Sequence, residues 1–388
     1  MTTCALDFAF ANEEQAFVKL ETACGILVKP STANRIYSVG PVDFGFEQED
    51  LEDGQIRSSA SKVSPKKGRK NPGDFSFTTY VKPSGTPGLA PEHDVLFQCL
   101  MGVKTPDPGV KTTYSLANQL DSFSLWLKKG HTAFALRGCT INSAEFSIAG
   151  EAIASIRWSG NSMETIWAGT ETSPANLIAS TTVIQLNTGG AALFCVGMYV
   201  SVGSDTNGAA GYAIINVNYN LDRITIGTPL ATPQGIGATI APWLPAAGVE
   251  VGEPVLGKLG MVTIATTDAI IKSASLSITN NIKYYTDEKN NTLTAERFGR
   301  PKMREINGSL NLYFLKRGLS YFYRSAYQIA NALVIPAGNV SGYIMELLVP
   351  YAEYKTPKIS GDEELGQDLS FMALASGSGN DELSIVFK

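Results

Sequence analysis

Residues 144–158, AEFSIAGEAIASIRW, carry the clearest fold signal in the sequence, because their side chains alternate between apolar and polar. The even positions run Ala144, Phe146, Ile148, Gly150, Ala152, Ala154, Ile156 and Trp158. The odd positions include Glu145, Ser147, Glu151 and Ser155. A period of two is typical of a strand with one buried and one solvated face. We therefore expect a strand over this stretch with its even side chains in the core.

The same alternation recurs along the chain. It appears at 274–278 and 310–314, and further strands fit 75–81, 343–349, 369–375 and 383–387. Half-solvated strands of this kind favour antiparallel sheets. Two segments have helical spacing instead, 91–101 and 318–333. The sequence predicts an all-β fold, an antiparallel β-sandwich or barrel, with one or two short helices packed against the sheets.

Charge is scarce in one long region. Residues 171–257 hold only six charged side chains, whereas amphipathic strands flank the region on both sides. Short strands and turns rich in Gly, Ala, Thr and Ile fit this region. We therefore expect an inserted small β-barrel or Ig-like domain at 169–261, within a discontinuous host domain of 1–168 and 262–388.

A polar arm between residues 40 and 74 carries two opposed blocks of charge. The acidic block contains Asp43, Glu47, Glu49, Asp50, Glu52 and Asp53. The basic block contains Lys62, Lys66, Lys67, Arg69 and Lys70. The two blocks can pair within the arm or with the arm of a neighbouring copy, and a solvated loop is the alternative interpretation.

Composition narrows the classes of function. The 31 basic and 36 acidic residues give a net charge of -5, which argues against binding nucleic acid through neutralised phosphates. The five cysteines lack a CxxC pair and are odd in number, so we expect reduced thiols rather than disulfides or a zinc site. We expect neither a secretory signal nor a membrane span.

Signatures of catalysis are not found in the sequence. The two histidines, His93 and His131, lie in no metal-binding spacing, and we expect both at the surface. There is no GxSxG elbow, and the glycine-rich pieces lack the context of a phosphate loop. We therefore expect no catalytic, cofactor-binding or metal-binding residues, and no enzyme activity.

Three stretches together resemble a known family. They are LRGCTINSAEFSIAGEAIASIRWSGNSMETI (136–166), IIKSASLSITNNIKYYTDEKNNTLTAERFGRPKMREINGSLNLYFL (270–315) and DLSFMALASGSGNDELSIVFK (368–388). They resemble the major tail tube proteins of long-tailed bacteriophages. The earlier pieces at 54–63, 73–83 and 93–102 follow that family's order of loop, strand and helix, and the resemblance covers about three quarters of the chain. The insert at 169–261 departs from the smallest members of that family.

The resemblance implies a structural virion protein. Its copies would form stacked hexameric rings, whose inner sheets surround a channel for DNA and the tape measure protein. Further implied partners are the tail terminator and distal tail or baseplate proteins, with assembly in the host cytoplasm and no membrane. The arm would lie between subunits and the insert on the outer wall. Residues expected to face the lumen are Glu145, Ser147, Glu151, Ser155, Ser273, Ser275, Ser277, Ser309 and Asn311.

Two other classes remain as alternatives. A receptor-binding or adhesion component of a virion would also be all-β, acidic and poor in cysteine. It would be expected to have tandem repeats or an aromatic platform for carbohydrate, and we find neither in the sequence. A hydrolase built on a β-sandwich would need polar side chains that converge in the fold.

Overall fold

The computed structural model describes residues 13–52, 66–246, 248, 250–258, 260–286, 294–361, 364–377 and 379–388. Within these residues the chain is mostly strand, with two α-helices, α1 (Asp94–Met101) and α2 (Leu319–Ala326). Neighbouring strands pair antiparallel, which confirms the expected all-β class. Neither helix in this part of the chain is long and apolar enough to cross a membrane.

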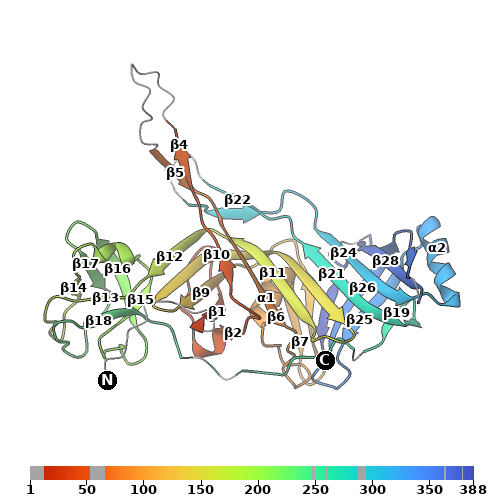
Figure 1. The fold of residues 1–388 in the computed structure, drawn as a ribbon, viewed down its shortest axis with the longest axis horizontal. Coiled ribbons are helices and arrows are strands. Elements are labelled where there is room, and N and C mark those ends of the chain that lie inside the picture. Colours follow the sequence, from red (N-terminus) through yellow and green to blue (C-terminus); the bar gives the residue numbers. More distant parts are fainter. Residues whose placement is uncertain are drawn as a thin grey trace, which may run out of the picture.

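Most strands belong to one closed barrel, which occupies the centre and right of Figure 1. Its strands are β1 (Gln15–Leu20), β2 (Arg35–Ile36), β3 (Asp43–Phe44), β6 (Gly73–Tyr80), β7 (Gly102–Asp107), β8 (Lys111–Leu116), β9 (Phe123–Lys129), β10 (Thr132–Ala149), β11 (Ser155–Ser162), β12 (Glu164–Ala168), β19 (Val262–Ile264), β20 (Thr267–Ala269), β21 (Ile271–Thr279), β24 (Glu305–Tyr313), β25 (Asn331–Ala337), β26 (Met345–Tyr354), β27 (Lys358–Ser360), β28 (Gly366–Ala373) and β29 (Ser384–Phe387).

The other strands form three smaller sheets. A six-stranded sheet has the order β13-β18-β15-β16-β17-β14, and two hairpins are β4–β5 and β22–β23. Three short 3-10 helices complete the described elements. The remaining bounds are β4 (Gln48–Leu51), β5 (Lys66–Lys70), β13 (Glu171–Thr172), β14 (Val183–Gln185), β15 (Tyr199–Val202), β16 (Tyr212–Asn218), β17 (Arg223–Ile226), β18 (Thr239–Pro242), β22 (Lys283–Tyr285), β23 (Arg297–Gly299), η2 (Thr32–Asn34), η3 (Gly190–Leu193) and η4 (Lys316–Gly318).

The stretch 144–158 is a hairpin, so the expectation of one continuous strand was wrong. Strand β10 ends at Ala149, β11 begins at Ser155, and Ala144 pairs with Trp158. Because this register pairs even positions with even positions, the alternation of apolar side chains continues through the turn. Ala144, Phe146, Ile156 and Trp158 are buried as expected, whereas Ala152 is exposed in the turn.

Strand β10 bends because a buried carboxylate holds its backbone. At Gly138 the φ angle is +62°, a conformation that favours glycine, and the pairing with β9 shifts register between Leu136 and Cys139. Glu21 accepts hydrogen bonds from the Gly138 N–H at 2.8 Å, from Ser122 Oγ at 2.6 Å and from other donors nearby. The bend lets the two halves of β10 pair with different strands: β9 and β12, then β11 and β21.

Helix α1 packs on the barrel core. It begins three residues later than expected and ends at Met101. Leu96, Phe97 and Leu100 on this helix are buried. The ring of Phe97 meets that of Trp158 edge-on at 5.2 Å, so the helix packs against the inner face of the β10–β11 hairpin.

The second helix is shorter than the sequence predicted. Helical spacing suggested 318–333, but α2 ends at Ala326 and the next strand, β25, begins at Asn331. Between them Gln328 adopts a φ of 51°, which a helix interior excludes. Residues 331–337 pair with β26, and this tertiary pairing overrides the local helical pattern. None of the residues of α2 whose side chains are described is buried.

The six-stranded sheet lies at the opposite end of the molecule from α2 (Figure 1). It shares one hydrophobic cluster with the barrel, in which Phe17, Trp126 and Ala135 of the barrel join Tyr212 of the sheet and Phe194, which follows η3. After β18 the chain returns along the barrel. The N–H of Val255 donates to Val81 O at 3.1 Å, and the N–H of Ala154 donates to Val255 O at 2.9 Å. The division at residues 169 and 261 stays a prediction.

Candidate functional site

A row of serine hydroxyls crosses the outer face of five neighbouring strands of the barrel. Strands β11, β10, β21, β24 and β28 are neighbours in that order. Ser147 lies opposite Ser155 on one side and Ser275 on the other. The row continues through the pairs Ser275–Ser309 and Ser309–Ser370. Directly paired residues point to the same face, so all five side chains lie on one surface.

Parallel rows continue this polar face. Glu145 lies opposite Ser277 and also opposite Arg157, while Ser273 lies opposite Asn311. The structure thus brings eight of the nine expected lumen residues onto one surface. The ninth, Glu151, lies exposed in the β10–β11 turn rather than on a strand, because the stretch expected to be one strand is a hairpin.

The polar side chains of this face bond mainly to one another. Ser275 Oγ and Ser309 Oγ are 2.8 Å apart, and Asn311 Nδ2 donates to Asp368 Oδ1 at 3.0 Å. A shallow hollow of about 470 Å³ lies over the middle of the rows, with Lys355 at its rim. Within the described residues, no group of three or more His, Cys, Asp or Glu side chains is placed to hold a metal ion. The face is a wettable surface of hydroxyls and amides with charges of both signs.

The arm is a charged hairpin that projects from the barrel (Figure 1). Asp50 pairs with Lys67 across β4 and β5, and their side chains form an ion pair of 2.6 Å. Arg69 and Glu49 form a second pair of 3.5 Å. In the described part of the arm, therefore, opposed charges meet within one copy.

The base of the arm is tied to the barrel. Lys70 lies 3.4 Å from Glu164, which also accepts from Arg137 at 2.7 Å. The remaining arm residues of the described part are exposed: Asp43 in β3, Glu47 ahead of β4, Glu52 after it, and Lys66 in β5. Two expected arm residues, Asp53 and Lys62, lie outside the described residues.

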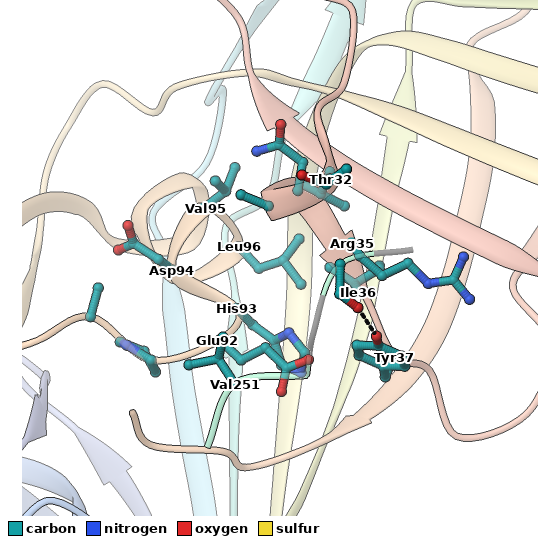
Figure 2. Close-up of a pocket in the computed structure, with 16 residues that line it drawn as sticks. Thr32, Arg35, Ile36, Tyr37, Glu92, His93, Asp94, Val95, Leu96 and Val251 are labelled. Atoms are coloured by element: carbon teal, nitrogen blue, oxygen red, sulfur yellow. Dashed lines mark hydrogen bonds between the residues drawn. The ribbon is translucent and has the colours of Figure 1, made fainter. Parts of the chain in front are cut away.

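The expectation of a surface His93 was wrong: its side chain is buried, with 3% of the residue exposed. It precedes α1 at a cavity of about 520 Å³ (Figure 2). Neither ring nitrogen has a hydrogen-bond partner among the described residues. Burial disfavours the imidazolium and Lys82 repels it, and together they lower the pKa of His93 to about 3. His93 is therefore neutral at physiological pH.

The returning segment after β18 closes this cavity. Tyr37 Oη donates to the carbonyl of Gly248 at 2.8 Å, and the buried Lys82 pairs with Glu92 at 3.3 Å and with Glu250. Figure 2 shows Glu92 and His93 side by side near Val251, and the guanidinium of Arg35 points away from them. No motif pointed to this cluster, because its members come from segments far apart in the sequence.

No family model matches the sequence, and a search of curated proteins finds no significant match.

Proposed function

We propose that this chain is the structural subunit of a phage-type tail tube, in which copies assemble as stacked hexameric rings around a channel. The observation that carries the proposal is the polar face of the sheet β11-β10-β21-β24-β28. Its inner side buries the core, whereas its outer side presents rows of hydroxyls and amides across five strands. Such a surface suits the wall of a channel through which another polymer slides.

The charge on this face supports the same proposal. Glu145 and Asp368 bring negative charge to it, and Arg157 and Lys355 bring positive charge. A duplex that releases few counterions binds weakly, so a wall without a basic cluster retains DNA poorly. DNA and the tape measure protein would pass without specific binding, and the tail terminator and distal tail or baseplate proteins would contact the tube ends. Assembly would take place in the host cytoplasm.

The projecting arm supports contacts between rings. Its hairpin extends away from the barrel, and its exposed polar surface cannot form a core of its own. The six-stranded sheet lies at the far end of the barrel, where it would extend from the outer wall of a tube.

Electron microscopy of the purified protein tests the proposal. Rings or tubes with a central channel are expected, and compact monomers at high concentration would contradict it.

A second candidate is an adhesion component of a virion. It is favoured by the exposed Ile178, Tyr219 and Ile236 of the six-stranded region, which a binding partner would cover. An adhesion protein would bind cells or glycans as a discrete particle and would not form tubes. The same micrographs therefore separate the two candidates.

A further inference from the structure

Helix α2 turns its apolar side to solvent. Leu319, Tyr323 and Tyr327 follow one another at intervals of four residues and are 63%, 58% and 66% exposed. Leu319 and Tyr323 lie on one stripe of the helix, a position that ordinarily faces a core, and Tyr327 is the C-cap residue that follows it. Leu315, in the loop before η4, is exposed as well. We call Leu315, Leu319, Tyr323 and Tyr327 the α2 stripe.

Contacts on the opposite side of α2 fix the direction of this stripe. The ring of Tyr321 lies 6.3 Å from that of Tyr354 in β26, and Gln367 Nε2 donates to Gly318 O at 3.1 Å. Ser325 Oγ lies 3.4 Å from Thr356 Oγ1. The helix is thus held on the barrel with its apolar stripe outward.

The helix lies close to the start of β27, because its Ser325 contacts Thr356, two residues before that strand. Beyond β24, strand β28 pairs with β26 over one part of its length and with β27 over another, and β27 has no strand on its other side among the described residues. All three of its residues are exposed, Ile359 among them. A free edge next to an exposed apolar stripe is a surface that another chain can cover.

The other edge of the same sheet is β6, from which the arm departs. On the side away from β11, residues 38–45 line β6: β3 and a bridge between Ser38 and Thr79 pair with it, and the N–H groups of Val39 and Gly45 donate to Thr78 O and Asp74 O. Val39, Phe46 and Leu51 are exposed along this segment. We call residues 38–51 the arm edge.

The two edges complement each other in charge. The arm edge carries the exposed acids Asp43 and Glu47, and the edge at α2 carries the exposed bases Lys316 and Lys358 together with one exposed acid, Glu364. We propose that the α2 stripe and β27 of one copy dock on the arm edge of a second copy. Apolar side chains would then meet apolar ones at the centre, with opposite charges at the rim.

Such a contact joins two different surfaces of the same chain. A heterologous contact of this kind is repeated from copy to copy, and it produces a closed ring when the rotation closes. The inference therefore deepens the proposed function by naming the surfaces that join neighbours within a ring, and its ring geometry rests on that function. The pairwise contact itself is testable in any assembly the protein forms.

Sedimentation velocity on the full chain, with circular dichroism to verify folding, tests the contact. The triple variant Leu319→Ser, Tyr323→Ser, Tyr327→Ser should need at least a tenfold higher protein concentration to assemble. The control Ile178→Ser, Ile236→Ser removes apolar side chains of similar exposure (69% and 73%) at the far end of the molecule, and should assemble as the unmodified chain does. Because all these side chains are exposed, both variants should keep the native spectrum.

A charge exchange supplies a second test. Lys358→Glu alone should weaken assembly, and Lys358→Glu with Asp43→Lys should restore it. Assembly of the triple variant at the unmodified concentration would overturn the docking contact, as would an unmodified chain that remains monomeric. If the unmodified chain and the triple variant form tubes equally well, the docking contact is wrong and the proposed function is retained. If the unmodified chain forms an oligomer without a channel that the triple variant abolishes, the contact stands and the proposed function fails.

Discussion

Removing the six-stranded sheet should destabilise the barrel, because the two share buried aromatic side chains. Phe17 and Trp126 belong to barrel strands β1 and β9, yet both are fully buried in a cluster completed by Tyr212 of the sheet and by Phe194, which follows η3. Replacing residues 171–242 by a Gly/Ser linker would expose the sides of these two rings that the sheet now covers.

The cost follows from the area exposed. A buried aromatic side chain covers roughly 150–250 Å², and neighbouring barrel strands retain part of each ring. Exposing about 200 Å² from the pair at about 25 cal/mol per Å² costs about 5 kcal/mol. Because the total stability of a domain is about 5–15 kcal/mol, the shortened chain should be marginally folded or insoluble.

Two compensating substitutions distinguish this cause from a general effect of deletion. Phe17→Thr and Trp126→Thr should raise the free energy of unfolding of the shortened chain, measured by urea denaturation and circular dichroism. In the full-length chain the same two substitutions should lower it by several kcal/mol, since they leave cavities in the shared cluster. Equal free energies of unfolding for the shortened chain with and without the two substitutions would show that Phe17 and Trp126 are not the cause. The compensated chain should form thinner tubes of unchanged axial repeat.

Three further predictions concern single clusters. Below about pH 6.5 the unfolded chain binds a proton at His93, whereas the folded chain binds it only near pH 3. The free energy of unfolding should therefore fall by about 1.4 kcal/mol for each pH unit between these two values. Urea denaturation of His93→Gln should lack this component, and equal pH dependence in both proteins would refute it. Glu21→Gln should lower the free energy of unfolding by about 3 kcal/mol because the buried carboxylate accepts several hydrogen bonds, whereas the exposed Glu13→Gln should change little; similar midpoints for both variants would count against this role. Reversing the charges of Lys66, Lys67, Arg69 and Lys70 should block polymerisation measured by light scattering while the subunit stays folded, and unchanged polymerisation would show that the arm is not required.

Local pattern was enough to predict the class of fold and the inward face of its central strands. Alternation identified Phe146, Ile156 and Trp158 as core, and their burial agrees. The same alternation hid the β10–β11 turn, because the hairpin pairs even residues with even residues. Because even-numbered residues face the core on both sides of the turn, the alternation shows no break there. Glu151 was expected on a strand for that reason.

The remaining differences come from contacts between distant segments. Residues 331–333 fit a helix locally but pair with β26. The local sequence favoured a surface position for His93, but the side chain is buried near Lys82 and the returning segment around Glu250. Trp126 belongs equally to the barrel and to the six-stranded sheet, a fact that spacing within a single strand cannot reveal.

A cryo-electron microscopy map of the assembled protein would show which face of the barrel surrounds the channel. We expect a ring or tube in which Ser147, Ser275 and Ser309 face the axis, with the six-stranded sheet outside and α2 against the arm edge of the next copy. A map in which these serines face away from the axis, or particles without any channel, would contradict it.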